Sequence, residues 1–271
     1  SYATRRMSRL AESLVELIRR TSAEIPDDVQ SAILRGLEQE KEGTIAKSAL
    51  EIIERNIDLA KRKSQPICQD TGSILFYVDC PVGLNQVEFE QEARDAVKEA
   101  TRLGYLRQNS VDSITGKNDG TNLGPGSPNL HFHQHASDEI AVRLVLKGGG
   151  CENVGAQFSL PNTPLEANRD LDGCRKVILE AVHLAQGRGC GPGVLGVCIG
   201  GDRASGYEFS KREFLRKLDD RNPDSKLDEL EQDILSTANE LGIGPMGFGG
   251  KTTLLGVKIG AANRVPASYF V

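Results

Sequence analysis

Apolar residues recur at helical spacing over the first part of the chain. Leu10, Leu14 and Ile18 share one face of a helix, and Pro26, which is followed by two aspartates, marks the start of a second helix. A third apolar stripe runs over residues 44–61. The spacing therefore predicts a helical N-terminal segment over residues 1–64.

After residue 64 the pattern changes to short apolar runs that alternate with longer amphipathic stretches. The predicted elements are a strand over 74–80, a helix over 86–104, a strand over 139–147, a helix over 170–186, a strand over 194–200, a charged helical stretch over 210–242 and a strand over 254–260. Residues 105–138 are rich in Gly, Asn and Ser and predict a long ordered loop.

Together these elements predict an α+β fold. The helical segment over 1–64 is followed by a mixed α/β domain over 65–271, which we expect to be continuous and to carry Gly-rich loops at its strand ends. Because loops on a rigid scaffold carry much of protein chemistry, we expect the functional residues in those loops.

Composition and charge exclude several classes of function. The chain has 271 residues, of which 38% are hydrophobic and 26% charged, and its formal net charge is −5. An acidic globular chain has no general attraction to nucleic acid or to an anionic membrane. No apolar run could span a bilayer and the start does not resemble a secretory signal, so we expect a cytoplasmic protein whose six cysteines are not structural disulfides. The apolar end, SYFV, favours a further segment or a partner beyond Val271.

Two motifs open rival interpretations. GIGPMGFGGKTT is similar to a phosphate-binding loop, but Pro245 stands where that pattern needs glycine, and a predicted strand follows it instead of a helix. HFHQH would place His131, His133 and His135 on one face of an extended segment, where imidazoles could bind zinc, or it could be an exposed strand edge. A nucleotide- or metal-binding protein without enzymatic activity is therefore the rival from another class.

Two loops carry the strongest candidate chemistry. QPICQDTG places a thiol, an amide and a carboxylate in sequence at Cys68, Gln69 and Asp70. The alternative, purely structural interpretation is a turn with a buried cysteine. KGGGCENVG puts three glycines directly after a strand, where their amides could approach an anion closely, or where the strand could end in a bulge. The residues alone leave both alternatives open.

Five segments, taken in order, resemble the iron–sulfur fumarase and tartrate dehydratase family. They are QPICQDTG, LRQNS with the later GTN, KGGGCENVG, GCGPGVLGVCIGGDR and GFGGKTTLLGVKI, and they span residues 65–259. The resemblance is to the alpha subunit of the two-subunit enzymes, or to the N-terminal region of the fused ones.

The resemblance implies an oxygen-sensitive [4Fe–4S] cluster that is held by three cysteines and leaves one iron without a cysteine ligand. It assigns Cys68 and Cys190 as ligands. The family's third ligand follows the last strand, but AANRVPASYFV contains no cysteine. We therefore expect this ligand beyond Val271, with Cys151 as the reserve inside the chain.

The resemblance also implies a hydro-lyase that reversibly hydrates fumarate to malate, with dehydration of tartrate to oxaloacetate as the alternative. Gln69, Asp70, Arg107 and Gly150 match substrate-binding positions, and Asp70 is the candidate for assisting proton transfer. The substrate is a small dicarboxylate. The main catalytic base is expected in a beta subunit or fused C-terminal domain, and we expect a dimer of such units.

Overall fold

The computed structural model describes residues 6–189 and 191–271, and these divide into two compact units. The first unit comprises the chain up to Ile25 together with Arg55–Gly149. The second unit comprises Pro26–Glu54 and Gly150–Val271. The predicted boundary at residue 64 does not coincide with this division, and a separate domain over 65–271 stays a prediction.

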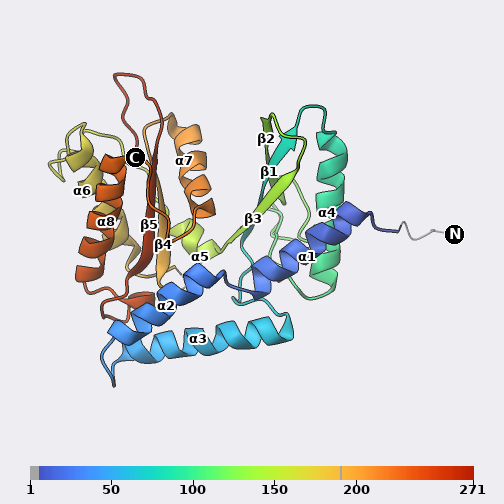
Figure 1. The fold of residues 1–271 in the computed structure, drawn as a ribbon, viewed down its shortest axis with the longest axis horizontal. Coiled ribbons are helices and arrows are strands. Elements are labelled where there is room, and N and C mark those ends of the chain that lie inside the picture. The colour runs from blue at the N-terminus through green and yellow to red at the C-terminus, as the bar shows by residue number, and fades with distance from the viewer. Residues whose placement is uncertain (1–5, 190) are drawn as a thin grey trace. The chain divides into compact units, whose positions relative to one another are not determined.

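The first unit is a three-stranded sheet with helices on one face (Figure 1). Its elements are α1 (Arg9–Ala23), the second half of α3 (Ile45–Lys63), β1 (Ser73–Pro81), α4 (Gln86–Arg102), β2 (Asn129–His135) and β3 (Ala141–Lys147).

The middle strand of this sheet organises the core of the first unit. β1 pairs in parallel with β2 and antiparallel with β3. Alternate β1 residues, among them Phe76 and Val78, pack against Ile18 of α1 and Phe89 of α4, and all four side chains are buried. The loop between α3 and β1 is therefore attached to a well-packed strand.

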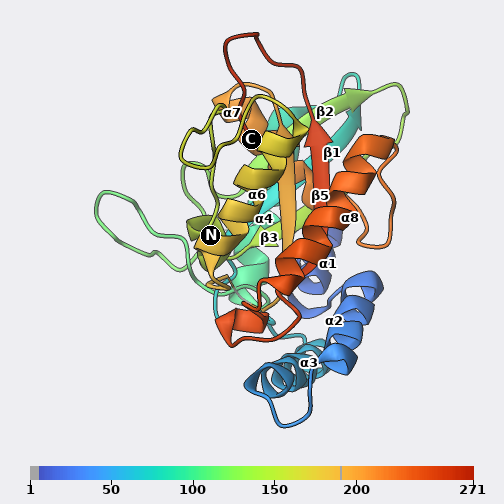
Figure 2. The ribbon, with the colours of Figure 1, turned by 90° about the vertical axis from the view of Figure 1, so that its left-hand side faces the viewer.

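The second unit is built around two parallel strands. Its elements are α2 (Asp27–Gln39), the first half of α3, α5 (Gly149–Asn153), α6 (Leu171–Ala185), β4 (Gly193–Ile199), α7 (Arg203–Arg212), the 3₁₀ turn η1 (Glu213–Leu215), α8 (Ser225–Glu240), the 3₁₀ turn η2 (Pro245–Gly247) and β5 (Leu254–Ala261). β4 pairs with β5, α6 and α8 pack on one face of the pair, and α7 lies on the other (Figures 1 and 2).

The predicted α+β fold with a helical N-terminal segment is confirmed, and two local predictions are wrong. β2 lies within the predicted loop over 105–138. The predicted helix over 210–242 is two helices, because a capping box formed by Asp202 and Ser205 starts α7 early and the chain then leaves helical geometry until Asp224 caps α8. The sequence left the structure of the glycines after β3 open, and Gly149 and Gly150 begin the short helix α5.

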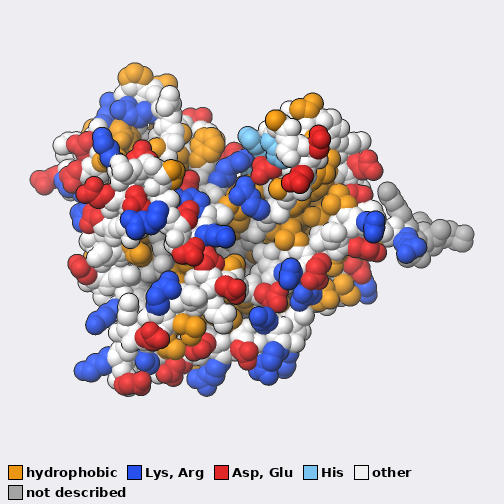
Figure 3. Space-filling model, in the orientation of Figure 1, with side chains coloured by type: hydrophobic (Ala, Val, Ile, Leu, Met, Phe, Trp, Pro, Cys, Tyr) orange, Lys and Arg blue, Asp and Glu red, His pale blue; other side chains and the backbone are white. Residues whose placement is uncertain are grey.

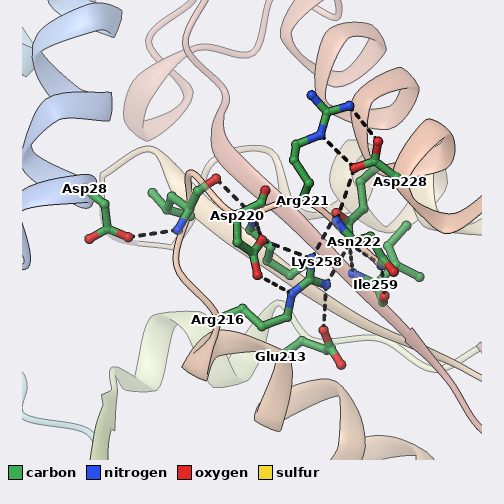
Figure 4. Close-up of polar contacts among 11 residues, drawn as sticks. Asp28, Glu213, Arg216, Asp220, Arg221, Asn222, Asp228, Lys258 and Ile259 are labelled. Carbon is green, nitrogen blue, oxygen red and sulfur yellow. Dashed lines mark hydrogen bonds and ion pairs between the residues drawn. The ribbon is translucent and has the colours of Figure 1, made fainter. Parts of the chain in front are cut away.

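A buried ion network anchors the irregular segment between α7 and α8 to β5 (Figure 4). Glu231 of α8 is only 2% exposed and accepts hydrogen bonds from the Ile259 backbone N–H, from Asn222 Nδ2 and from Arg216. Lys258 of β5 donates to Asp220 Oδ1 at 2.6 Å. Burial acts to raise the pKa of Asp220, but hydrogen bonds from Arg216 and Lys258 outweigh it and lower that pKa.

We expect Glu231→Ala to destabilise the protein by about 1–3 kcal/mol, because it leaves the buried Ile259 N–H without its acceptor and removes one of the three carboxylates that bind Arg216. The free energy of unfolding in urea measures this cost. Arg221→Ala is the matched control, since Arg221 pairs with Asp228 in the same network but is 70% exposed, so its removal should have little effect. Equal losses in the two variants would contradict a structural role for the buried part.

Candidate functional site

The QPICQDTG loop joins α3 to β1 and lies wholly within the first unit. Cys68 and Gln69 are exposed, whereas Thr71 is buried. Gly72 has φ +78°, and a Cβ added there would overlap the Lys147 backbone carbonyl. Glycine is therefore required where this loop turns into β1 beside the end of β3.

Asp70 is held by two backbone amides. Its Oδ1 accepts from Gly72 N at 2.9 Å, and its Oδ2 accepts from Gly149 N at 2.6 Å. A Cβ added at Gly149 would lie 2.8 Å from Oδ2, so the glycine lets the backbone approach the carboxylate. One of the amides expected to meet an anion therefore binds the protein's own carboxylate, and this orients Asp70 within the loop.

Arg107 is attached to the same loop through its backbone and its side chain. Its backbone N–H donates to Thr71 Oγ1 at 2.8 Å, and its Nε donates to the Cys68 carbonyl at 3.2 Å. Arg107 is exposed, and within the described residues its guanidinium makes no other hydrogen bond that would occupy the Nη groups. A planar guanidinium with both Nη groups available suits a carboxylate ligand. The first unit thus brings together four predicted site residues, namely Cys68, Gln69, Asp70 and Arg107.

Burial separates the five cysteines that the structure describes into two groups. Cys80 and Cys174 are fully buried and Cys198 is 5% exposed. Burial raises the pKa of the Cys174 thiol and raises the pKa of the Cys198 thiol to about 11. Because a thiolate is the form that binds metal, Cys174 and Cys198 suit the core and not a cluster, and Cys80 is enclosed by the core of the first unit. Cys68 is exposed and Cys151 is half-buried, so both have the exposure that a ligand needs.

Two further positions of the proposed site are in the second unit, and a third is not described. Gly150 and Cys151 belong to α5 in the second unit, and a Cβ added at Gly150 would lie 3.4 Å from the Arg188 carbonyl. Cys190 lies outside the described residues. Within residues 6–189 and 191–271, no three His, Cys, Asp or Glu side chains are grouped as a metal site. The assignment of the cluster ligands stays a prediction.

The phosphate-binding interpretation of GFGGKTT conflicts with the geometry of the second unit. Glu40 Oε1 accepts from Lys251 N at 2.7 Å, from Thr252 N at 2.8 Å and from Thr252 Oγ1 at 3.0 Å. The donors that could have cradled a phosphate already bind a buried carboxylate. The strand β5 follows the loop, so the loop does not lead into the helix N-terminus on which a phosphate-binding loop depends.

The three histidines of HFHQH lie on the edge strand β2, and histidine side chains show at the surface near it (pale blue in Figure 3). Each has a different neighbour: His131 stacks on Tyr77, His133 Nδ1 lies 3.6 Å from Asp79 Oδ1, and His135 Nδ1 accepts from a backbone N–H. The segment is extended as expected for one shared face, but these neighbours do not form a zinc site among the described residues.

Sequence reasoning missed two residues that build the site. Thr71 was noted only as part of the loop, yet its hydroxyl accepts the Arg107 backbone N–H. Asn122, in the GTN segment, binds the backbone on both sides of Gln108. A Gly-Thr-Asn sequence signals a turn, but the sequence does not show which distant backbone groups the asparagine binds.

Comparisons with known proteins agree with the resemblance. A family model described as fumarate hydratase (Fumerase) matches residues 11–271. A putative fumarate hydratase class I of Geobacillus stearothermophilus is 51% identical over 98% of this chain, which spans only 52% of that relative's length. A putative L(+)-tartrate dehydratase subunit alpha of Methanocaldococcus jannaschii is 33% identical over 96% of this chain and 91% of its own. The L(+)-tartrate dehydratase subunit alpha of Escherichia coli K12 is 28% identical over 98% of this chain and 86% of its own.

No helix in the described part of the chain combines the length and apolar character that crossing a membrane requires.

Proposed function

Because the chain belongs to the fumarate hydratase (Fumerase) family, we propose that it supplies one part of the active site of a hydro-lyase that reversibly hydrates fumarate to malate. The observation that carries this proposal is the attachment of Arg107 to the Cys68–Asp70 loop. A carboxylate-binding group is thereby held against the loop that carries a candidate proton-handling carboxylate and an exposed thiol.

Class I fumarate hydratases generally depend on iron and sulfur, and the thiols of this chain fit such a group in part. We assign a [4Fe–4S] cluster with one iron lacking a cysteine ligand to Cys68, Cys190 and a third ligand beyond Val271, with Cys151 in reserve. The exposure of Cys68 and the burial of Cys80, Cys174 and Cys198 support this choice of donors. When bound, the cluster supplies a Lewis-acidic iron that polarises the substrate's hydroxyl and carboxylate groups.

The chain's own residues have separate roles in this proposal. Arg107 binds a substrate carboxylate through its Nη groups, and the Gly150 backbone and the exposed amide of Gln69 add polar contacts. Asp70, oriented by two amides, assists proton transfer at the substrate. The main catalytic base lies outside this chain.

The relatives that this chain nearly spans are alpha subunits, and this supports a beta subunit or a fused C-terminal domain as the partner. The half-length match to the Geobacillus relative fits a fused arrangement equally well. We expect a dimer of such units, and an oxygen-sensitive cluster fits the reducing cytoplasm.

Dehydration of tartrate to oxaloacetate is the second candidate. It is favoured by the two alpha-subunit relatives, whose names give L(+)-tartrate as their substrate. The higher identity to a protein named as a fumarate hydratase favours fumarate. Both substrates are dicarboxylates, so Arg107 has the same role in either reaction.

An anaerobic assay of the chain with and without its partner region tests the proposal. We expect no turnover by residues 1–271 alone, turnover of fumarate when the partner region is added, and loss of that activity in air. Parallel assays with L(+)-tartrate decide between the two substrates. Air-stable turnover by residues 1–271 alone, or no hydration of fumarate and no dehydration of tartrate by the iron-loaded complete protein, would contradict the proposal.

A further inference from the structure

Asn122 is a buried side chain that uses its whole hydrogen-bonding capacity. It is 1% exposed, and its Oδ1 accepts from the backbone N–H groups of Asn109 at 3.0 Å and Ser110 at 3.1 Å. Its Nδ2 donates to the Arg107 carbonyl at 2.7 Å and to Thr101 Oγ1 at 3.0 Å. A carboxamide offers two acceptor and two donor positions, and all four are occupied here.

These bonds fix the backbone immediately around Arg107. Asn122 binds the carbonyl of Arg107 from one side, and Thr71 Oγ1 accepts the N–H of Arg107 from the other. Thr71 is 5% exposed, so both bonds are shielded from water. The exposed guanidinium thus extends from a backbone position that two buried side chains determine.

The residue type at position 122 is narrowly constrained. Its φ of +62° is in the left-handed region, which Asn, Asp and Gly tolerate better than other residues. Gly could not make the four bonds. Asp could accept from the two backbone N–H groups, but its second oxygen would face the Arg107 carbonyl without a proton to donate. Asparagine alone satisfies both the backbone conformation and the bonds.

We propose that Asn122 is a positioning residue for substrate binding, which acts with Thr71 to hold Arg107 where its guanidinium meets the substrate carboxylate. The inference rests on the proposed role of Arg107. It goes further in assigning a function to a buried residue of the GTN segment, which touches neither substrate nor cluster.

A double-mutant cycle in the complete, iron-loaded enzyme separates positioning from general structural support. Asn122→Asp should lower kcat/KM for the substrate that the enzyme turns over by about tenfold to a hundredfold, mainly through a higher KM, because it displaces a correctly charged binding group. In an Arg107→Ala background the same substitution should cause less than about a threefold further loss, since residues that act as one unit are not additive.

Two substitutions at Thr71 provide a matched pair of variants that tests the same inference if Asn122→Asp folds poorly. Thr71→Val keeps the shape but removes the acceptor, and we expect a loss in the same direction that is again absent in Arg107→Ala. Thr71→Ser retains the hydroxyl and should restore most of the activity. Hydrogen exchange over residues 107–110 of the complete enzyme gives a readout independent of turnover, and it should be faster in Asn122→Asp and in Thr71→Val.

The outcomes distinguish this inference from the proposed function. Equal losses with and without Arg107, or normal kcat/KM in Thr71→Val and Asn122→Asp, would overturn the positioning role and leave Arg107 as the carboxylate-binding residue. If Arg107→Ala leaves kcat/KM unchanged in an active enzyme, the assignment of Arg107 is wrong, and so is this inference. Iron content equal to wild type in every variant is required for the comparison, because it shows that the cluster is unchanged.

Discussion

Cys68→Ser should remove nearly all of the iron from the reconstituted protein and reduce hydro-lyase activity to background. Cys68 is exposed at the head of a loop that also contains Asp70 and is bonded to Arg107, so a metal held there would lie beside both groups. Serine is a poor substitute, because its hydroxyl does not ionise as a thiol does and an iron–sulfur cluster requires thiolate ligands. Iron content and the broad visible absorbance after anaerobic reconstitution measure the effect.

Cys80→Ser is the matched control for this substitution. Cys80 lies on β1 of the same unit and is fully buried in the core, so its replacement should affect stability but leave the iron content near wild type. Cys174→Ser and Cys198→Ser test the second unit in the same way. If these three variants lose iron while Cys68→Ser retains it, the assignment of ligands is wrong.

The periodic elements of this fold could be predicted from local apolar patterns, which are amphipathic in the helix α4 and a continuous apolar run in the strand β1. The strand that became β1 and the helix that became α4 bury one continuous set of apolar side chains, and both were placed within two residues of their ends. β2 was missed because only Leu130 and Phe132 of this strand pack against the core, and the histidines and glutamine that alternate with and follow them resemble a polar loop. The break between α7 and α8 was missed because the charged residues there serve a buried network that the local sequence does not reveal.

The candidate site could be predicted only where its functional groups are on residues that are adjacent in the sequence. The thiol, amide and carboxylate of CQD belong to consecutive residues, so the covalent chain alone keeps them close together. The contact of Asp70 with Gly149 joins residues 79 positions apart, and the Asn122 amide must fold back onto Arg107. Such contacts depend on strand order and loop path, which periodicity does not determine. Exposure of Cys68 and burial of Cys198 likewise follow from packing and not from residue type.

Arg107→Ala should lower kcat/KM of the complete enzyme by roughly two to three orders of magnitude, because a substrate carboxylate would lose the charged guanidinium that binds it in a bidentate manner. Arg107→Lys should recover only part of the loss, since an ammonium keeps the charge but not the planar geometry that binds two oxygens. Steady-state kinetics with the preferred dicarboxylate measure both effects.

Folding and cluster assembly should be nearly unchanged in these Arg107 variants, and this separates substrate binding from structure. The side chain is exposed, and its hydrogen bond to the described part of the protein is a single contact from Nε to the Cys68 carbonyl. The bonds that hold its backbone, from Thr71 and Asn122, do not depend on the side chain and persist in alanine. Melting temperature and iron content should therefore match wild type.

Arg102→Ala is the control, since Arg102 is an exposed arginine of α4 that pairs with Glu99, and the kinetics of this variant should not change. A loss of less than about threefold in Arg107→Ala, with the cluster intact, would exclude a charged carboxylate contact at this position, because such a contact costs far more when one partner is removed.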